Sequence, residues 1–264
     1  MKRQRIRRKI IFFMFLLFPI TLNYFSPALM TMGTLERVAS ASLIVWAVIF
    51  LTSLVFGRAF CGYGCPFHGL QLAWEKVADK PLRPVKHLRA LKYVLWGAWV
   101  GAVVVLAVLR GGWLRVDLLY MTPLGVSVDS AQSLITYFML VGITLVPMAL
   151  GRRGFCHYVC PFGVFGIVGT KIKQALHLPS LQLRANPAAC SSCKACDRVC
   201  PMSLPVSTLV AGGDMRHTEC ILCGSCVDRC ANGAVAYSWT AAEKGPTRDP
   251  AGSKPADARS VRTC

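Results

Sequence analysis

Four long apolar stretches without a charged side chain constrain this chain more than any other feature of its sequence. They span residues 10–29, 38–56, 93–109 and 130–150. A bilayer core about 30 Å thick takes roughly 20 apolar residues to cross as a helix, so we predict four transmembrane helices. The composition, 54% hydrophobic and 16% charged, agrees with a membrane protein. The alternative, buried helices of a soluble core, is disfavoured by four such stretches.

Basic residues are unevenly distributed between these stretches. Residues 1–9 carry six basic and no acidic side chains, residues 57–92 carry seven and two, and residues 151–173 carry four and none. Because cytoplasmic loops are enriched in Lys and Arg, we predict that both termini face the cytoplasm. Most of the net charge of +18 then belongs to membrane flanks, and no nucleic-acid partner is expected. A cleavable signal peptide is the alternative for the first stretch.

A Cys-x3-Cys-Pro motif occurs twice, each time after the second apolar stretch of a pair. The segment GRAFCGYGCPFHG contains Cys61 and Cys65, and its echo GRRGFCHYVCPFG, with one inserted residue, contains Cys156 and Cys160. Such duplication predicts two halves, each of two helices, related by an axis along the membrane normal. The four cysteines would then meet near that axis, and on a helix cysteines four apart share one face.

Three roles are open for these four cysteines. They are ligands of a further Fe–S cluster or another thiophilic metal, redox-active thiols, or buried small residues at tight helix exits. His68 and His157 lie within or beside the motifs. Each is a candidate for metal ligation, hydrogen bonding to a thiolate or proton relay, and packing is an equal alternative.

Eight further cysteines form two identical runs near the C-terminal end. The pattern Cys-x2-Cys-x2-Cys-x3-Cys begins at Cys190 and again at Cys220. In bacterial ferredoxins three closely spaced thiolates hold one [4Fe–4S] cluster, and the fourth ligates the other cluster. We therefore predict two clusters, the first held by Cys190, Cys193, Cys196 and Cys230 and the second by Cys220, Cys223, Cys226 and Cys200.

Other uses of these eight cysteines fit the sequence less well. Zinc sites normally use two CxxC pairs with a longer spacer, and disulfides conflict with a cytoplasmic location. Ala231 replaces the proline expected after the last cysteine, whereas Pro201 follows the first run. No haem is predicted, because no intramembrane histidines are spaced to sandwich one. Cys264 lies outside all four cysteine groups and receives no role.

The predicted fold is an α-helical membrane protein with a small C-terminal α+β domain of the bacterial ferredoxin type. Residues 1–173 form the membrane domain, with its four helices as two duplicated pairs, and residues 174–186 form a linker. Residues 187–240 form the two-cluster domain. Residues 241–264 are rich in Gly, Pro, Lys and Asp and are predicted to be disordered.

With its four apolar stretches, two Cys-x3-Cys-Pro motifs and double ferredoxin run, the chain resembles the ferredoxin-type membrane proteins of the NapH/MauN group. The resemblance covers nearly the whole chain, from Arg7 to about Trp239. It implies an electron-transfer component of a quinol dehydrogenase in the bacterial inner membrane. Electrons would pass between the quinone pool and a periplasmic reductase or dehydrogenase, with a second ferredoxin-like partner subunit.

Two functions of other classes compete with this interpretation. In an assembly or maturation factor, the paired cysteines would handle a metal such as copper, and the ferredoxin-like domain would reduce it. A redox sensor is the third hypothesis, although the sequence contains no recognisable output domain.

Overall fold

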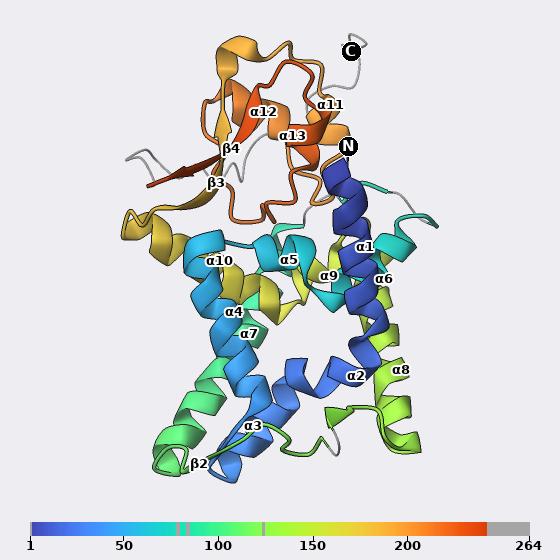
Figure 1. Ribbon diagram of the computed structural model, residues 1–264, viewed down its shortest axis with the longest axis vertical. Helices are drawn as coiled ribbons and strands as arrows, with labels where there is room; N and C mark the ends of the chain where they lie inside the picture. Colours follow the sequence, from blue (N-terminus) through green and yellow to red (C-terminus); the bar gives the residue numbers. More distant parts are fainter. Residues whose placement is uncertain (1, 78–79, 83–84, 123–124, 242–264) are drawn as a thin grey trace.

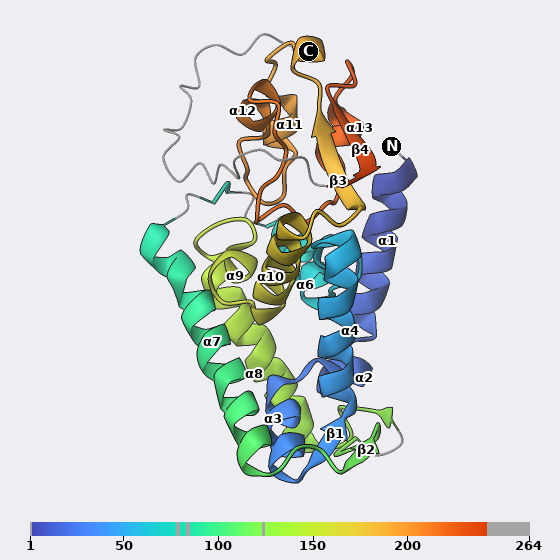
Figure 2. The same cartoon turned by 90° about the vertical axis from the view of Figure 1, so that its left-hand side faces the viewer.

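The computed structural model describes residues 2–77, 80–82, 85–122 and 125–241, and the molecule is built in two levels along its long axis (Figure 1). Long helices form the lower level, a small unit of short helices and two strands forms the upper level, and short helices lie between them (Figure 2). The helices of the lower level and of this middle layer are α1 (Lys2–Leu16), α2 (Phe18–Thr21), η1 (Leu22–Phe25), α3 (Pro27–Leu35), α4 (Ala41–Phe56), α5 (Ala59–Tyr63), α6 (Pro66–Trp74), α7 (Lys86–Leu109), α8 (Ala131–Met148), α9 (Gly154–Tyr158) and α10 (Pro161–Ala175). The upper unit contains β3 (Ser180–Ala185), η3 (Pro187–Ala189), α11 (Ala195–Arg198), α12 (Val206–Ala211), α13 (Ser225–Arg229) and β4 (Val235–Thr240).

The first predicted span, residues 10–29, is not one continuous helix, so its crossing of the membrane as a single bent span stays a prediction. α1 ends at Leu16, and the following segment Phe18–Phe25 is bent from it by 55°. Pro19 lies in the first turn of α2, and Pro27 opens α3. Because proline has no N–H to donate and suits the first turn of a helix, the two prolines start new helices here.

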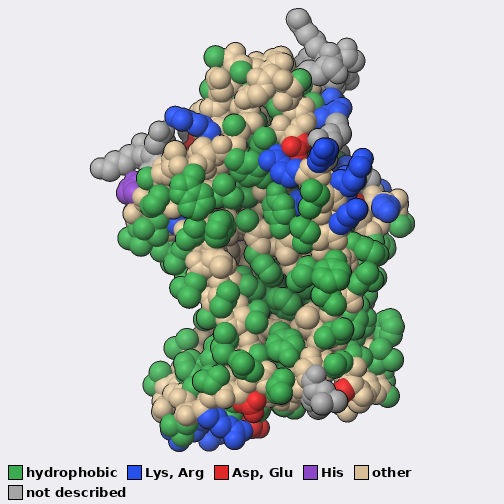
Figure 3. Space-filling view, in the orientation of Figure 1, with side chains coloured by type: hydrophobic (Ala, Val, Ile, Leu, Met, Phe, Trp, Pro, Cys, Tyr) green, Lys and Arg blue, Asp and Glu red, His purple; other side chains and the backbone are tan. Residues whose placement is uncertain are grey.

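The apolar helices of the lower level differ in length. Among the described residues, His87–Leu109 and Ala131–Met148 are long and apolar enough to cross a bilayer, and the bent pair adds a third if it forms one span. Within the predicted span 38–56, α4 has 16 residues, or about 24 Å. Hydrophobic side chains cover most of the lower level in Figure 3, with Lys and Arg gathered near the upper end of α1 and at the lower rim. The arrangement with four spans stays a prediction.

The lower end of the molecule is closed by a short parallel pair of strands. β1 (Val38–Ser40) pairs with β2 (Arg115–Asp117), so the connection that follows α3 is joined to the one that follows α7. This pairing holds the outer loops of the two halves of the lower level together.

The two copies of the cysteine motif adopt matching local structures in the middle layer. Each consists of a helix of five residues, α5 or α9, followed by a helix that begins at the proline of the motif, α6 or α10. Cys65 and Cys160 are the N-cap residues of α6 and α10. The two cysteines of a motif therefore lie on either side of a helix break, rather than on one helix face as the spacing suggested.

The upper unit begins earlier than the sequence suggested. β3 and β4 pair antiparallel from Ser180 opposite Thr240 to Ala185 opposite Val235. The predicted linker 174–186 therefore contains the end of α10 and the whole of β3, which is a strand of the upper unit. The predicted tail, with Cys264, lies outside the described residues except for Ala241.

Candidate metal centres

The four cysteines predicted to hold the second cluster line one cavity. Cys200, Cys220, Cys223 and Cys226 surround an empty volume of about 430 Å³, which is otherwise lined mainly by apolar side chains such as Leu204 and Met215. Burial raises the pKa of Cys200 to about 12 and that of Cys220 to about 11. A thiolate at this place therefore needs a bound cation, and metal binding to thiols supplies one as it releases their protons. The donor set fits an iron–sulfur cluster.

The two cysteine runs share an unusual backbone shape. In each run the residues on either side of the second cysteine have positive φ, at Ser192 and Lys194 (56° and 55°) and at Leu222 and Gly224 (51° and 70°). Alternation between right-handed and left-handed conformations turns successive N–H groups towards one point, which makes a concave site for an anion. Sulfur-rich clusters with thiolate ligands are anionic, so both loops suit them.

The cysteines predicted to hold the first cluster lie in the outer part of the upper unit. Cys190, Cys193, Cys196 and Cys230 are all partly exposed, whereas Cys200, Cys223 and Cys226 are buried. Cys190 and Cys196 interact electrostatically, and the backbone N–H of Ala234 donates a hydrogen bond to Cys230 Sγ at 3.3 Å. The first site is thus more open to solvent than the second.

The four cysteines of the duplicated motif, named here the four-cysteine site, come together in the middle layer. Cys65 and Cys160 are buried, and the four thiols interact electrostatically with one another. Gln71 Nε2 donates a hydrogen bond to Cys156 Sγ at 3.1 Å. A hydrogen bond from Cys160, supported by Arg153 and Gln71, lowers the pKa of Cys156 to about 6. Cys156 is therefore the thiol of this set that ionises first.

A test for a single bound metal ion is negative. In the part of the chain that the structure describes, no group of three or more His, Cys, Asp or Glu side chains is arranged to hold one ion. A [4Fe–4S] cluster makes a different demand, because each of its four thiolates binds a different iron atom.

Two buried arginines lie beside the four-cysteine site and were missed in the sequence. Arg153 is 1% exposed and donates from Nε to Glu75 at 2.8 Å, while its Nη1 and Nη2 have no hydrogen-bond partner among the described residues. Arg58, also buried, interacts electrostatically with Cys61 and Cys156. Buried donors without a partner are rare, and here they suit an anionic metal–thiolate centre. The sequence contains a signal for both arginines, because each precedes the first cysteine of its motif by three residues.

The two histidines named in the sequence are both buried and hydrogen-bonded. His68 Nδ1 lies 2.6 Å from the carbonyl oxygen of Cys61, and His157 Nε2 lies 3.3 Å from that of Met202. Burial lowers the pKa of His157 to about 4, so it is neutral near pH 7. The contact of His157 joins the middle layer to the upper unit, whereas that of His68 lies within the first motif.

One buried carboxylate joins the middle layer and the lower level to the upper unit. Glu219, which precedes Cys220, accepts a hydrogen bond from Arg58 Nη1 at 2.8 Å and another from Lys92 Nζ. Burial opposes the charge of Glu219, but Arg58 and Lys92 hold its pKa well below the usual range. All three side chains are at most 4% exposed. The ion cluster therefore fixes the second cysteine run against the middle layer and the lower level.

The first motif also touches the second cysteine run directly. A Cβ at Gly62 would lie 2.4 Å from the carbonyl oxygen of Ile221, so a side chain at position 62 has no room. Tyr63 adds a contact, since its hydroxyl donates to the carbonyl oxygen of Cys223 at 3.4 Å. The loop of Cys61 and the loop of Cys223 are thus in backbone contact.

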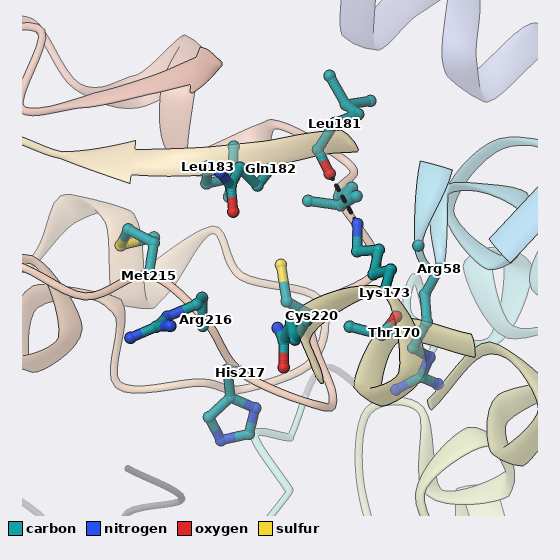
Figure 4. A pocket seen from close by; sticks show the side chains of 13 residues that line it. Arg58, Thr170, Lys173, Leu181, Gln182, Leu183, Met215, Arg216, His217 and Cys220 are labelled. Atoms are coloured by element: carbon teal, nitrogen blue, oxygen red, sulfur yellow. Dashed lines mark hydrogen bonds between the residues drawn. The ribbon is translucent and has the colours of Figure 1, made fainter. Parts of the chain in front are cut away.

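A second cavity, of about 390 Å³, lies between α10 and β3 and shares Cys220 with the first (Figure 4). Lys173 Nζ points across it and donates to the carbonyl oxygen of Leu181 at 3.1 Å. Burial lowers the pKa of Lys173 to about 8. Its lining combines this amine with apolar side chains such as Met215 and Leu222, which suits a small amphipathic molecule.

Comparison with known proteins agrees with this arrangement. A family described as a 4Fe-4S binding domain matches residues 38–84 and 133–179, the two halves that carry the duplicated motif. A second family, described as a 4Fe-4S dicluster domain, matches residues 189–235. No solved structure matches the chain.

Similar proteins include one whose name assigns it to electron transport. YccM of Escherichia coli strain K12 is 24% identical over 221 residues, which cover 75% of this chain and 56% of YccM. The ferredoxin-type protein NapH of Haemophilus influenzae is 26% identical over 75% of this chain and 68% of its own length. NapH of E. coli K12 is 25% identical over 80% of this chain and 75% of its own length.

These matches support a membrane iron–sulfur protein of electron transfer. Within that class, the chain is similar to the NapH ferredoxin-type proteins, in agreement with the resemblance found in the sequence.

The contact between the two levels can be tested through Glu219. We expect Glu219→Gln to destabilise the protein by about 3–5 kcal/mol, because it leaves the buried charges of Arg58 and Lys92 without a carboxylate. Thermal unfolding of the purified protein in detergent measures the effect. The control is Asp214→Asn. Asp214 pairs with Arg216 at 2.7 Å in a more exposed position, so this substitution should destabilise the protein by only about 0–1 kcal/mol. Equal effects of the two substitutions would contradict the importance of the buried ion cluster.

Proposed function

We propose that this protein is the membrane component of a quinol dehydrogenase and relays electrons between the quinone pool and a partner redox protein. The observation that carries the proposal is the backbone contact between the four-cysteine site and the loop of the second predicted cluster. Electron-transfer centres work over short distances, and this contact gives the membrane part a direct route to the upper unit.

The proposal gives each group of cysteines a role. Cys190, Cys193, Cys196 and Cys230 hold the first [4Fe–4S] cluster, and Cys220, Cys223, Cys226 and Cys200 hold the second. Each cluster, when bound by these cysteines, would supply a one-electron redox centre. Oxidation of one quinol then yields one quinone, two protons that pass to water, and two electrons, one for each cluster. Cys61, Cys65, Cys156 and Cys160 form the redox or metal site at which electrons enter or leave the membrane part.

The chain's own side chains prepare these sites. Arg58 and Arg153 place positive charge beside the four thiols, which stabilises a thiolate or an anionic metal centre there. Gln71 orients Cys156 through its amide hydrogen bond. Glu219 holds the second cysteine run in place, and its negative charge is offset by Arg58 and Lys92.

Membrane topology and partners follow from the same proposal. The bent pair α1–η1 and the helices α4, α7 and α8 form the four spans, with both termini and the upper unit on the cytoplasmic side of a bacterial inner membrane. The partly exposed first cluster then faces a ferredoxin-like partner subunit, and a periplasmic reductase or dehydrogenase lies at the other end of the electron route. Support comes from the basic segments that flank the predicted spans on that side.

A second candidate function is a maturation factor that handles a metal such as copper. The observation that favours it is the set of four thiols with Cys65 and Cys160 buried, because thiolates are preferred ligands of Cu(I). Binding of one ion by three or more of these thiols would require them to move closer together than they are in this structure. In that function the upper unit would reduce the metal.

Loss of one ligand tests the cluster assignment. We expect Cys223→Ser to lose about half of the ferredoxin-type cluster iron, because one of two four-thiolate sites is broken. Iron analysis and visible absorption of anaerobically purified protein measure the change. Cys264→Ser, the same substitution outside the four cysteine groups, is the control and should keep all of the iron. Unchanged iron and absorption in Cys223→Ser would show that the ligand assignment is wrong.

Reaction with quinone tests the function itself. Full-length protein is reduced with dithionite, and cluster reoxidation by a quinone analogue is followed by visible absorption. In Cys156→Ser we expect the rate to fall at least about tenfold, equivalent to about 1.4 kcal/mol of activation free energy, because the entry site is damaged. Cys264→Ser should react as the wild type does. A wild-type protein that reacts no faster than Cys156→Ser, and whose four-cysteine site binds Cu(I) tightly, would instead support the maturation factor.

A further inference from the structure

The first two turns of α1 bind the loop that carries Cys223. Arg3 Nη2 donates to Asp228 Oδ1 at 2.7 Å and to the carbonyl oxygen of Gly224 at 3.1 Å. Gln4 Nε2 donates to Asp228 Oδ2 at 2.6 Å and to the carbonyl oxygen of Cys223 at 3.0 Å. These contacts join residues separated by more than 200 positions, and none of them was foreseen from the sequence.

Arg7 extends this contact to the first cysteine motif. Its Nε donates to Gln4 Oε1 at 2.8 Å, and its Nη1 donates to the carbonyl oxygen of Gly62 at 3.2 Å. Arg7 is 4% exposed and also lies against His68, at 3.4 Å from Nε2. A continuous hydrogen-bonded path therefore runs from the four-cysteine site through Gly62, Arg7 and Gln4 to Cys223.

The buried charge of Arg7 acts on the second cluster site. Arg7 interacts electrostatically with Cys223, and in a buried environment such an interaction is screened far less than it is at the surface. Reduction adds a negative charge to a cluster, so a fixed cation nearby favours the reduced form. Gln4 holds the guanidinium in place and at the same time fixes the carbonyl of the ligand residue.

We propose that Arg7, held by Gln4, is a positioning residue that raises the reduction potential of the second cluster and aligns it with the four-cysteine site. The proposal rests on the proposed function, because it takes Cys223 as a cluster ligand. It assigns α1 a part in electron transfer in addition to its place in the membrane part.

An anaerobic redox titration of full-length protein, followed by electron paramagnetic resonance, tests this inference. The second cluster is identified by its loss in Cys223→Ser. In Arg7→Gln we expect its reduction equilibrium to become at least about tenfold less favourable, equivalent to about 59 mV for one electron. Arg7→Lys keeps the positive charge, so the reduction potential of the second cluster should stay close to that of the wild type. Arg5→Gln removes the same charge from an exposed position of α1 and serves as the matched control.

The outcomes separate this inference from the function on which it rests. If the reduction potential of the second cluster shifts no more in Arg7→Gln than in Arg5→Gln, the inference is overturned. A wild-type protein without clusters overturns the proposed function instead. If Arg7→Gln loses its second cluster, Gln4→Ala decides, because Gln4 is only half-buried. In Gln4→Ala the reduction potential of the second cluster should also fall. A potential equal to that measured in Arg5→Gln would overturn the inference.

Discussion

The carboxylate of Glu219, enclosed between Arg58 and Lys92, joins the two levels of this protein. Desolvation of a buried ion costs several kcal/mol, so such a group persists only with close partners of opposite charge. Around the four-cysteine site, the buried cations Arg58, Lys92 and Arg153 face the carboxylates Glu219 and Glu75, and the buried Arg7 adds a further positive charge. An anionic thiolate centre would balance the remaining positive charge. The interface and the candidate centre are therefore parts of one electrostatic arrangement.

Backbone geometry makes a second contribution, which does not depend on charged side chains. Both ferredoxin-type runs place left-handed residues on either side of their second cysteine, and the first motif presents Gly62, without a side chain, to the carbonyl oxygen of Ile221. This backbone shape suits a concave site for an anionic cluster, and the contact at Gly62 brings the two levels close together. A bulkier residue at position 62 would separate the four-cysteine site from the second cluster site.

The sequence predicted what is encoded locally and missed what depends on distant partners. The spacing of Cys200, Cys220, Cys223 and Cys226 led to one shared site, and these residues line one cavity. The strand β3 was mistaken for a linker because its partner β4 lies about 55 residues away along the chain. Arg58 and Glu219 are 161 positions apart, so no local pattern reveals their contact. Pro19 and Pro27 mark the break in the first span, but a prediction of spans from hydrophobicity alone does not take prolines into account.

Hydrogen–deuterium exchange of the full-length wild-type protein in lipid nanodiscs tests most directly whether the upper unit is docked onto the cysteine motifs. We expect the backbone amides of residues 58–64 and 219–224 to exchange slowly and to a similar extent, because each segment covers the other. Slow exchange in β3 and β4 together with fast exchange in both of those segments would contradict it. That result would describe an upper unit that is folded but not bound to the membrane part.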